Sequence, residues 1–519
     1  MQQSIDTISL NNKRIAKNTL LLYVRMLFTM LVSLYTSRVV LNTLGVEDFG
    51  IYNVVGGIVA MFSILSGSLS AAIQRFITFE LGKEDRSKLK SIFSTAVTIQ
   101  IFLALLIIVL AETIGLWFLN NRINVSVERM IAANWVFQFS IITFAINLIS
   151  IPYNAIIIAH ERMKVFAYIG VLDVFLKLLV VFLLVRSPMD KLVFYSLLLM
   201  LVALFIMVVY RYYCKRNFED CNCKFVWDKL LLKEMISFSG WNFIGASSAV
   251  LRDQGVNIIL NVFCGTVINA ARGIAFQVST TLQGFISNFM MALNPQITKS
   301  YASGEREYMM FLIFQGARFS FYMLFLLSLP IIIEAENILL IWLKNVPEHT
   351  VNFVRLILLF SMSESISTPL ITAMLATGKI KKYQLIVGGL QMANFPISYL
   401  LLQEGLFPEI TMIVAIAISQ CCLIARLYLL RSMIGLSVRQ YLKKVYLNTV
   451  LVGVLSALLP IWIYNQISNE VFRGILVFCS SVSCTLVVVF YVGCNSKERI
   501  FILQRMAVLK RKIKNDSNC

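Results

Sequence analysis

The sequence contains few charged residues for its length. Only 14% of its 519 residues are Asp, Glu, Lys or Arg, whereas about 25% are charged in a typical soluble domain. Hydrophobic residues make up 58% of the chain, and the mean hydropathy is +0.79. A composition this apolar excludes a water-soluble globular protein and indicates a polytopic membrane protein.

Histidine is rarer still, because His160 and His349 are the two in the chain. Three of the ten cysteines, Cys214, Cys221 and Cys223, share one polar segment, but no fourth zinc ligand accompanies them. Most other cysteines lie in or beside apolar segments. We therefore expect no metal site, no cofactor and no disulfide framework, and we expect the thiols to be reduced.

Long apolar segments, by contrast, are abundant. A helix needs about 20 mainly apolar residues to cross the hydrocarbon core of a bilayer. Fourteen such segments predict an all-α polytopic membrane protein. The first segment has no cleavage site, so it is expected to be an uncleaved helix. The segments lie near 18–43, 50–80, 91–119, 130–159, 165–186, 191–213, 235–263, 266–294, 308–333, 351–377, 383–403, 409–431, 445–466 and 472–494.

Positive charges are concentrated in alternate connections between these segments. One set of connections, which includes both chain ends, holds 31 Lys and Arg, and the other set holds 6. Basic connections favour the cytoplasmic side, so both termini are expected in the cytoplasm. The tail at 495–519 is expected to bind anionic lipid at the inner surface. This distribution argues against nucleic-acid binding despite the net charge of +19.

The second part of the sequence weakly repeats the first at a nearly constant offset. "FITFELGKEDR" at 76 corresponds to "QITKSYASGER" at 296, and "WFLNN" at 117 corresponds to "WLKNV" at 342. "IPYNAIIIAHERMK" at 151 corresponds to "TPLITAMLATGKIK" at 368, which places Pro152 on Pro369 and Lys164 on Lys381. Three matches in the same order predict two homologous halves of six helices each.

An even number of helices gives both halves the same orientation in the membrane. We therefore expect two parallel six-helix lobes at 1–213 and 235–431, joined by a cytoplasmic linker at 214–234. Two C-terminal helices lie within 432–494, and the basic tail follows at 495–519. Two lobes around a central cavity are the plan of an alternating-access transporter.

Nine basic residues lie inside the apolar segments, where acidic residues are fewer. An arginine at the centre of a membrane helix costs about 2.5–3.5 kcal/mol on insertion scales, so such residues indicate function. Arg426 is near a segment end and is expected to extend to the membrane surface. Asp173 and Lys177 are spaced i, i+4 and are expected to neutralise each other. The nine are Arg25, Arg38, Arg75, Lys177, Arg252, Arg272, Arg318, Arg355 and Arg426.

Arg252, Asp253 and Glu364 lie near the middle of their segments. Helix neighbours are about 100° apart, so Arg252 and Asp253 are not expected to face each other. Arginine suits phosphate because its planar group stays charged and makes two parallel bonds. We therefore predict a cationic cavity for an anionic head group. Its predicted substrate-binding residues are Arg25, Arg38, Arg75, Arg252 and Arg272, and the ion-coupling candidates are Asp253, Glu364 and Asp173.

Two stretches carry a resemblance to a known family. They are "RIAKNTLLLYVRMLFTMLVSLYTSRVVLNTLGVEDFGIYNVV" at 14–55 and "IWLKNVP" at 341–347. With the fourteen segments, they resemble the multidrug/oligosaccharidyl-lipid/polysaccharide (MOP) exporter superfamily, and within it the O-antigen and capsule repeat-unit flippases. The resemblance implies transfer of undecaprenyl-pyrophosphate-linked oligosaccharide across a bacterial inner membrane. It also implies that cavity arginines hold the pyrophosphate.

Other readings of the sequence remain open. A drug exporter of the same superfamily would place acidic groups in the cavity, but basic residues outnumber acidic ones here. A membrane glycosyltransferase or polymerase would need acid–base groups, and the longest outer connection, 334–350, is short. We therefore expect a transporter and not an enzyme. A coupling ion, sodium or proton, and a polysaccharide polymerase are the further partners that we consider.

Overall fold

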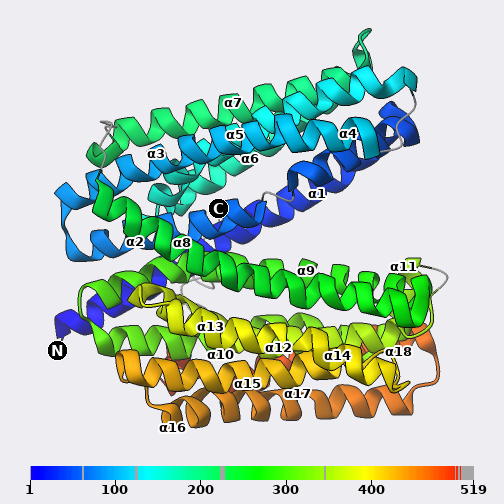
Figure 1. Ribbon diagram of the computed structural model, residues 1–519. Helices are drawn as coiled ribbons and strands as arrows, with labels where there is room; N and C mark the ends of the chain where they lie inside the picture. The colour runs from blue at the N-terminus through cyan, green and yellow to red at the C-terminus, as the bar shows by residue number, and fades with distance from the viewer. Residues whose placement is uncertain are drawn as a thin grey trace, which may run out of the picture. The chain divides into compact units, whose positions relative to one another are not determined.

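The computed structural model describes residues 2–60, 63–122, 127–221, 228–343, 346–496, 498–500 and 503. These residues form helices and short connections, with no β-strand among them (Figure 1). Ten helices of the described chain are long and apolar enough to cross a membrane. The prediction of an all-α polytopic membrane protein is confirmed. Most of the predicted basic tail lies outside the described residues.

The four predicted segments that are not among these ten are 18–43, 50–80, 235–263 and 266–294. Their described residues are helical as well. They also occupy the first and second positions of each predicted repeat. The count of fourteen crossings therefore stays a prediction.

The first half of the chain consists of long helices joined by short turns. α3 continues through the π-helical turn η1 into α4, and Asp85 caps its N-terminus by accepting a hydrogen bond from the backbone N–H of Lys88. The bounds are α1 Gln2–Ala60, α2 Ser63–Lys83, α3 Arg86–Leu110, η1 Ala111–Gly115, α4 Leu116–Arg122, η2 Val127–Arg129, α5 Met130–Ala159, α6 Met163–Arg186, α7 Lys191–Asn217 and η3 Glu219–Cys221.

The second half repeats this pattern and adds a final pair of helices. The bounds are α8 Lys229–Val250, η4 Leu251–Gly255, α9 Val256–Ala302, α10 Arg306–Ile333, α11 Ala335–Leu343, α12 Thr350–Thr377, α13 Lys381–Met392, α14 Asn394–Gln403 and α15 Ile410–Ile434. The final elements are α16 Val438–Tyr441, η5 Leu442–Tyr446, α17 Leu447–Gln466, α18 Glu470–Val488 and η6 Val489–Gly493.

Glycines at equivalent places interrupt α1 and α9. Gly45 has φ 81° and ψ 170°, and Gly265 has φ 82° and ψ −177°. A positive φ of this size is a conformation that glycine adopts readily and other residues avoid. The separation of the two glycines in sequence equals the offset between the matching stretches that begin at 76 and 296. Each predicted repeat therefore has the same break between its first and second segments.

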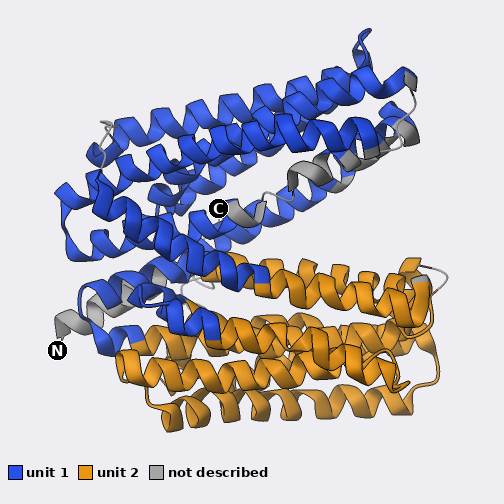
Figure 2. Ribbon diagram, viewed as in Figure 1, with its two compact units in different colours: residues 1–247, 291–309, 372–385 blue, residues 248–290, 310–371, 386–519 orange. Residues whose placement is uncertain are grey.

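The described chain divides into two compact units (Figure 2). Unit 1 contains Met1–Ser247, Met291–Met309 and Thr372–Leu385, and unit 2 contains Ser248–Met290, Met310–Ile371 and Ile386–Cys519. Unit 1 therefore includes α1 to α7, most of α8, the end of α9 with the start of α10, and the α12–α13 turn. The predicted lobes at 1–213 and 235–431 follow the sequence repeat and stay a prediction.

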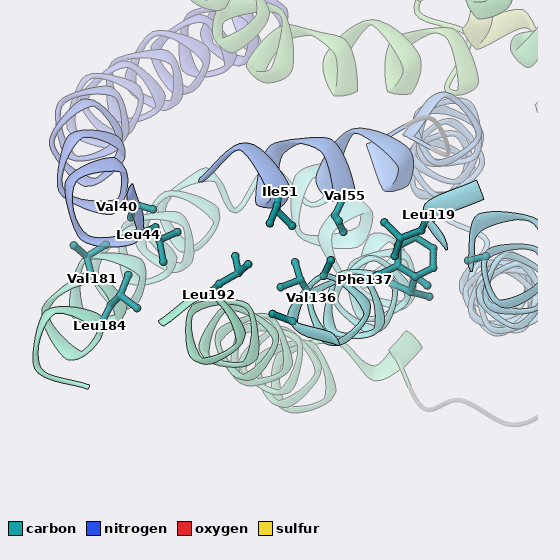
Figure 3. Close-up of a cluster of buried hydrophobic side chains, with 14 residues drawn as sticks. Val40, Leu44, Ile51, Val55, Leu119, Val136, Phe137, Val181, Leu184 and Leu192 are labelled. Carbon is teal, nitrogen blue, oxygen red and sulfur yellow. The ribbon is translucent and has the colours of Figure 1, made fainter. Parts of the chain in front are cut away.

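Unit 1 has an apolar core at one end of its helices. Figure 3 shows side chains of α1, α5, α6 and α7 gathered there, among them Leu44, Phe137, Leu184 and Leu192. Leu184 and Leu192 are fully buried and flank the turn between α6 and α7. These contacts bring helices that are far apart in sequence into one bundle.

Unit 2 is held together by buried polar contacts as well as apolar ones. The Tyr441 hydroxyl donates to the Ile366 carbonyl at 2.8 Å, which joins α16 to α12. Arg318 donates to the Gly493 carbonyl at 2.8 Å and pairs with Glu498 at 2.7 Å. α10 therefore holds the end of the last helix and the residues that follow it.

Candidate functional site

The centre of the candidate site is η4, the π-helical turn that joins α8 to α9. Arg252 and Asp253 lie in it and form a two-pronged salt bridge, with Nε–Oδ1 at 2.8 Å and Nη2–Oδ2 at 3.1 Å. The expectation that these neighbours would not face each other is wrong, because the long arginine side chain folds back onto the next residue. The guanidinium also lies 5.1 Å from the centre of the Phe360 ring.

Arg272 reaches the same turn from α9. It is 4% exposed, and its Nη1 donates to the Asp253 carbonyl at 3.2 Å and to the Asn257 side chain. Its Nε is buried and has no hydrogen-bond partner in the described structure. Arg252 therefore binds the carboxylate of Asp253, and Arg272 binds the backbone carbonyl of the same residue. This arrangement leaves a donor that an anionic ligand could use.

Glu364 lies on α12, close to this turn. It accepts a hydrogen bond of 2.6 Å from the Ser419 hydroxyl, and Arg426 Nη1 lies 3.7 Å from the same oxygen. Its carboxylate also acts electrostatically on Arg252. The five charged groups are Arg252, Arg272, Arg426, Asp253 and Glu364, so the cluster carries one net positive charge.

Arg426 is 1% exposed, so the expectation that it extends to the membrane surface is wrong. Burying a guanidinium requires a counter-charge, and Glu364 on α12 supplies it. The sequence could not identify this pair because its members are on different helices. Their pairing depends on how α12 packs against α15.

A chain of hydrogen bonds leads away from Glu364. Ser419 bonds to Ser363 at 2.8 Å, and Gln420 Nε2 donates to Ser363 at 2.6 Å. The Tyr446 hydroxyl then donates to Gln420 at 3.2 Å. The chain links Glu364 on α12 to η5, at the start of the last pair of helices. None of these partners was identified from the sequence.

Unit 1 holds the other predicted residues. The Arg25 guanidinium lies 4.3 Å from the Phe166 ring centre, against α6. Arg75 donates to the Ala376 carbonyl at 3.1 Å. Arg38 lies in α1, but its side chain is outside the described residues. Asp173 pairs with Lys177 at 2.7 Å on one face of α6, as their spacing indicates.

The predicted site residues therefore divide between the two units. The structure brings Arg252, Asp253 and Arg272 together, with Glu364 nearby, in unit 2. Each of these four residues stands out in the sequence because it is a charge within an apolar segment.

Known proteins that resemble this chain are membrane proteins and transporters. A family model described as polysaccharide biosynthesis protein matches residues 15–301. The uncharacterized membrane protein EpsK of Bacillus subtilis (strain 168) is 20% identical over 289 residues, which are 55% of this chain and 56% of that protein. The chain thus spans about half the length of the curated relative that it matches.

Solved structures show the same fold. An outward-facing multidrug resistance MATE family transporter of the MOP superfamily matches with a TM-score of 0.72 at 13% identity, over 82% of this chain and 96% of the other. A MOP superfamily transporter from Pyrococcus furiosus, described as having a binding pocket of reverse polarity, matches with a TM-score of 0.68 at 13% identity, over 82% and 96% of the two chains. At this identity the likeness concerns the fold alone.

Proposed function

Because the chain belongs to the polysaccharide biosynthesis protein family, we propose that it is a flippase for lipid-linked oligosaccharide. Its substrate is an oligosaccharide joined to undecaprenyl pyrophosphate, such as a repeat unit of O-antigen or capsule. It moves this substrate from the inner to the outer leaflet of a bacterial inner membrane. Both termini lie in the cytoplasm, and the two lobes at 1–213 and 235–431 alternate in access.

One observation carries this proposal, namely the pair of guanidinium groups at η4. Arg252 and Arg272 are both anchored by Asp253, and Arg272 retains a buried Nε without a partner in the described structure. A pyrophosphate carries more negative charge than one carboxylate, and it accepts two parallel bonds from each guanidinium. It therefore competes with the Asp253 carboxylate for Arg252, and with the Asp253 carbonyl and the Asn257 side chain for Arg272.

The same exchange provides a way to couple transport to an ion. When pyrophosphate takes Arg252, the Asp253 carboxylate loses its two-pronged partner and becomes a site for a proton or a sodium ion. Glu364 offers a second carboxylate, and its hydrogen-bonded chain extends to Tyr446. Asp173 is a weaker candidate because Lys177 already neutralises it.

A drug exporter is the second candidate, and the fold shared with a multidrug transporter favours it. Such a carrier would use Asp253 and Glu364 to hold a cationic drug. The charge of the transported molecule distinguishes the two functions. The net positive charge of the cluster favours an anion.

Transport in proteoliposomes tests the proposal. A fluorescent undecaprenyl-pyrophosphate disaccharide is placed in both leaflets, and flipping is measured as the fraction protected from an impermeant quencher. We expect Arg272→Ala to abolish flipping and Arg272→Lys to retain a small part of it. Lysine keeps the positive charge but lacks the planar pair of N–H donors of the guanidinium group. Arg186→Ala is the control, because it removes an exposed basic residue at the end of a different helix.

Either of two results would contradict the proposed substrate. One is flipping at the wild-type rate in Arg272→Ala. The other is wild-type protein that leaves the lipid in place but expels a lipophilic cation from the same vesicles.

A further inference from the structure

The ends of α2 and α9 cross closely inside unit 1. A Cβ atom on Gly82 would lie 2.8 Å from the Cβ of Ala302 and 2.8 Å from the carbonyl oxygen of Lys299. Gly82 and Ala302 have the same separation in sequence as Gly45 and Gly265. The crossing thus joins equivalent positions of the two predicted repeats. Small side chains allow the two backbones to come this close.

Glu161 is bound by side chains from the end of α9, the second helix of this crossing. It lies in the turn between α5 and α6, is 5% exposed and has a φ of 56°. Gln296 Nε2 donates to its carboxylate at 2.6 Å and Lys299 Nζ at 2.8 Å, and both lie at the end of α9. Arg14 Nε of α1 lies 3.1 Å from it. A buried carboxylate needs such partners, so a helix of the second repeat stabilises a turn of the first.

A reciprocal contact lies at the turn after α12. The alignment of Pro152 with Pro369 places Gly378 at the position of Glu161, and Gly378 also has a positive φ, 75°. Arg75 of α2 donates to the Ala376 carbonyl at 3.1 Å, and a Cβ on Gly378 would lie 2.6 Å from Arg75 Nη2. A helix of the first repeat therefore holds a turn of the second.

Aromatic rings surround the Arg75 guanidinium. Its central carbon lies 4.8 Å from the Phe76 ring centre, 4.6 Å from that of Phe79 and 5.6 Å from that of Phe238. Cation–π attraction to these rings favours the charged group when it is partly withdrawn from water. Protein groups therefore hold the Arg75 guanidinium, although its buried Nε, like that of Arg272, has no hydrogen-bond partner in the described structure.

We propose that these contacts are two clasps that keep this end of the carrier closed. The first clasp is Glu161 with Lys299 and Gln296, and the second is Arg75 with the Ala376 carbonyl. Both release when this end opens during a transport cycle. Glu161, Lys299 and Arg75 are positioning residues, so Arg75 acts on the conformation and not on pyrophosphate. The inference rests on the proposed function only in requiring a carrier with two states.

Release of the first clasp leaves the buried Glu161 carboxylate with a charged partner. Arg14 belongs to the same repeat as Glu161 and stays beside the carboxylate when α9 withdraws. Phe76 and Phe79 lie on α2 with Arg75, so two of its three rings move with it. The bond that Arg75 loses is to a neutral carbonyl.

Distances between spin labels test the proposal without any substrate. Labels replace Arg162 and Ser303, which are exposed beside the crossing, in a background without native cysteines. Double electron–electron resonance then gives the populations of short and long separations. We expect Glu161→Gln and Lys299→Met each to raise the long-distance population several-fold. Arg75→Gln should do the same if it is a clasp, and should leave the populations unchanged if it is a phosphate ligand.

Two glycine pairs supply matched controls. Gly82→Ala places a methyl group against the α9 backbone and should open this end, whereas Gly67→Ala in the same helix meets nothing within 4 Å. Gly378→Ala should displace Arg75. Its control is Gly304→Ala, because Gly304 has a similar positive φ, 81°, but a Cβ there would meet nothing within 4 Å. Equal effects of Gly82→Ala and Gly67→Ala would mean that the crossing is not a gate.

The possible failures can be told apart. If Glu161→Gln, Lys299→Met and Gly82→Ala leave the distances unchanged while lipid-linked oligosaccharide is flipped, the clasps are wrong and the proposed function stands. If the distances shift but no such lipid is flipped, the clasps stand and the substrate is wrong. Thermal unfolding of each variant in detergent identifies any variant that has simply failed to fold.

Discussion

Arg129 and His349 occupy equivalent positions of the two predicted repeats, and each binds an acidic residue that immediately precedes a later helix of its own unit. The distance along the sequence from Arg129 to His349 equals the distance from Gly45 to Gly265, the two glycines that interrupt α1 and α9. Arg129 binds Asp190, which caps α7, and its Nε also donates to Asp48 at 2.8 Å. His349 Nδ1 lies 2.7 Å from Glu409, which precedes α15. The same contact thus occurs in both predicted repeats, with an arginine in one and a histidine in the other.

The first prediction concerns the arginine version of this contact. Arg129→Ala leaves Asp48 and Asp190 without their charged donor, and it should lower the free energy of unfolding by about 1–3 kcal/mol. Arg129→Lys should lose less, because it keeps the charge. Thermal unfolding in detergent measures the effect. Arg186→Ala, which alters an exposed arginine of α6, is the control and should change the melting temperature little.

This stabilisation should depend on pH in a defined direction. Burial alone would raise the pKa of Asp190, but hydrogen bonds from Arg129 and from the Val193 backbone outweigh it and hold the pKa below its ordinary value. A depressed carboxyl pKa stabilises the fold above the unfolded value, about 3.9, and that stability is lost as the pH falls further. The gap between wild type and Arg129→Ala should therefore narrow below about pH 4. A constant gap down to about pH 3 would contradict this account.

The second prediction concerns His160, at the end of α5. Burial lowers its pKa to about 4, with Lys299 and Arg162 adding to the effect, and its ring stacks on Phe218 at 4.4 Å. As the pH is lowered, the histidine of the unfolded chain binds a proton at about pH 6.5. The buried histidine of the folded chain does so only at a lower pH. Stability should therefore fall as the pH decreases from about 6.5 to 4, by at most about 3 kcal/mol.

His160→Phe should remove this pH dependence and keep the ring stack. The measurement is the melting temperature between about pH 4 and 8 for the variant and for wild type. His349→Phe is the comparison: it loses the contact with Glu409 but keeps His160, so the fall in stability at low pH should remain. Parallel curves for wild type and His160→Phe would show that His160 is not the group responsible.

The third prediction concerns the Arg318–Glu498 pair in unit 2. The two side chains are 5% and 7% exposed. Arg318→Met leaves a buried carboxylate unpaired and should cost about 3–5 kcal/mol, whereas removing both charges should recover most of that loss. The Gly493 carbonyl would still accept a hydrogen bond from Tyr322. Arg86→Met, from the exposed pair with Glu219, should have little effect. No recovery in the double variant would mean that Arg318 acts through other contacts.

The bilayer makes much of this fold predictable from sequence. Crossing it requires a long apolar segment, and the limits of these segments in the sequence locate the helices: the segment predicted at 130–159 is α5, and 351–377 differs from α12 by one residue. The paired breaks at Gly45 and Gly265 could have been found from their separation, which equals the offset of the first matching stretch. They were missed because neither glycine lies in a matching stretch of sequence.

The candidate site was only partly predictable. Arg252, Asp253 and Arg272 stand out as charges in apolar segments, but their mutual contacts depend on the π-helical turn, which has no clear sequence signal. The pairing of Arg426 with Glu364 depends on how two distant helices pack. Helix periodicity describes one helix at a time, so it cannot show which side chains of two helices meet.

The fourth prediction tests Glu364 as an ion-linked residue. Glu364→Gln keeps the shape and can still accept from Ser419, but it cannot carry a charge or bind a proton. If Glu364 couples transport to an ion, the variant should lose the pH or sodium dependence of flipping. Ser419→Ala, which removes the hydrogen bond but keeps the carboxylate, should only shift that dependence. Full activity with unchanged dependence in Glu364→Gln would make Glu364 a structural partner of Arg426.

The last prediction separates two roles for Arg252. As a pyrophosphate ligand, Arg252→Ala should abolish flipping, and Arg252→Lys should retain part of it because the charge survives without the fork. Membrane insertion should survive both changes, since alanine removes a central charge that costs about 2.5–3.5 kcal/mol on insertion scales. The rival role is to neutralise Asp253, its partner at 2.8 Å. In that case Arg252→Ala destabilises the protein, because the Asp253 carboxylate loses its salt-bridge partner. Adding Asp253→Asn should then restore folding and flipping together. Restored flipping in this double variant would rule out the ligand role. Restored folding without flipping would support that role if Asp253→Asn alone still flips the lipid.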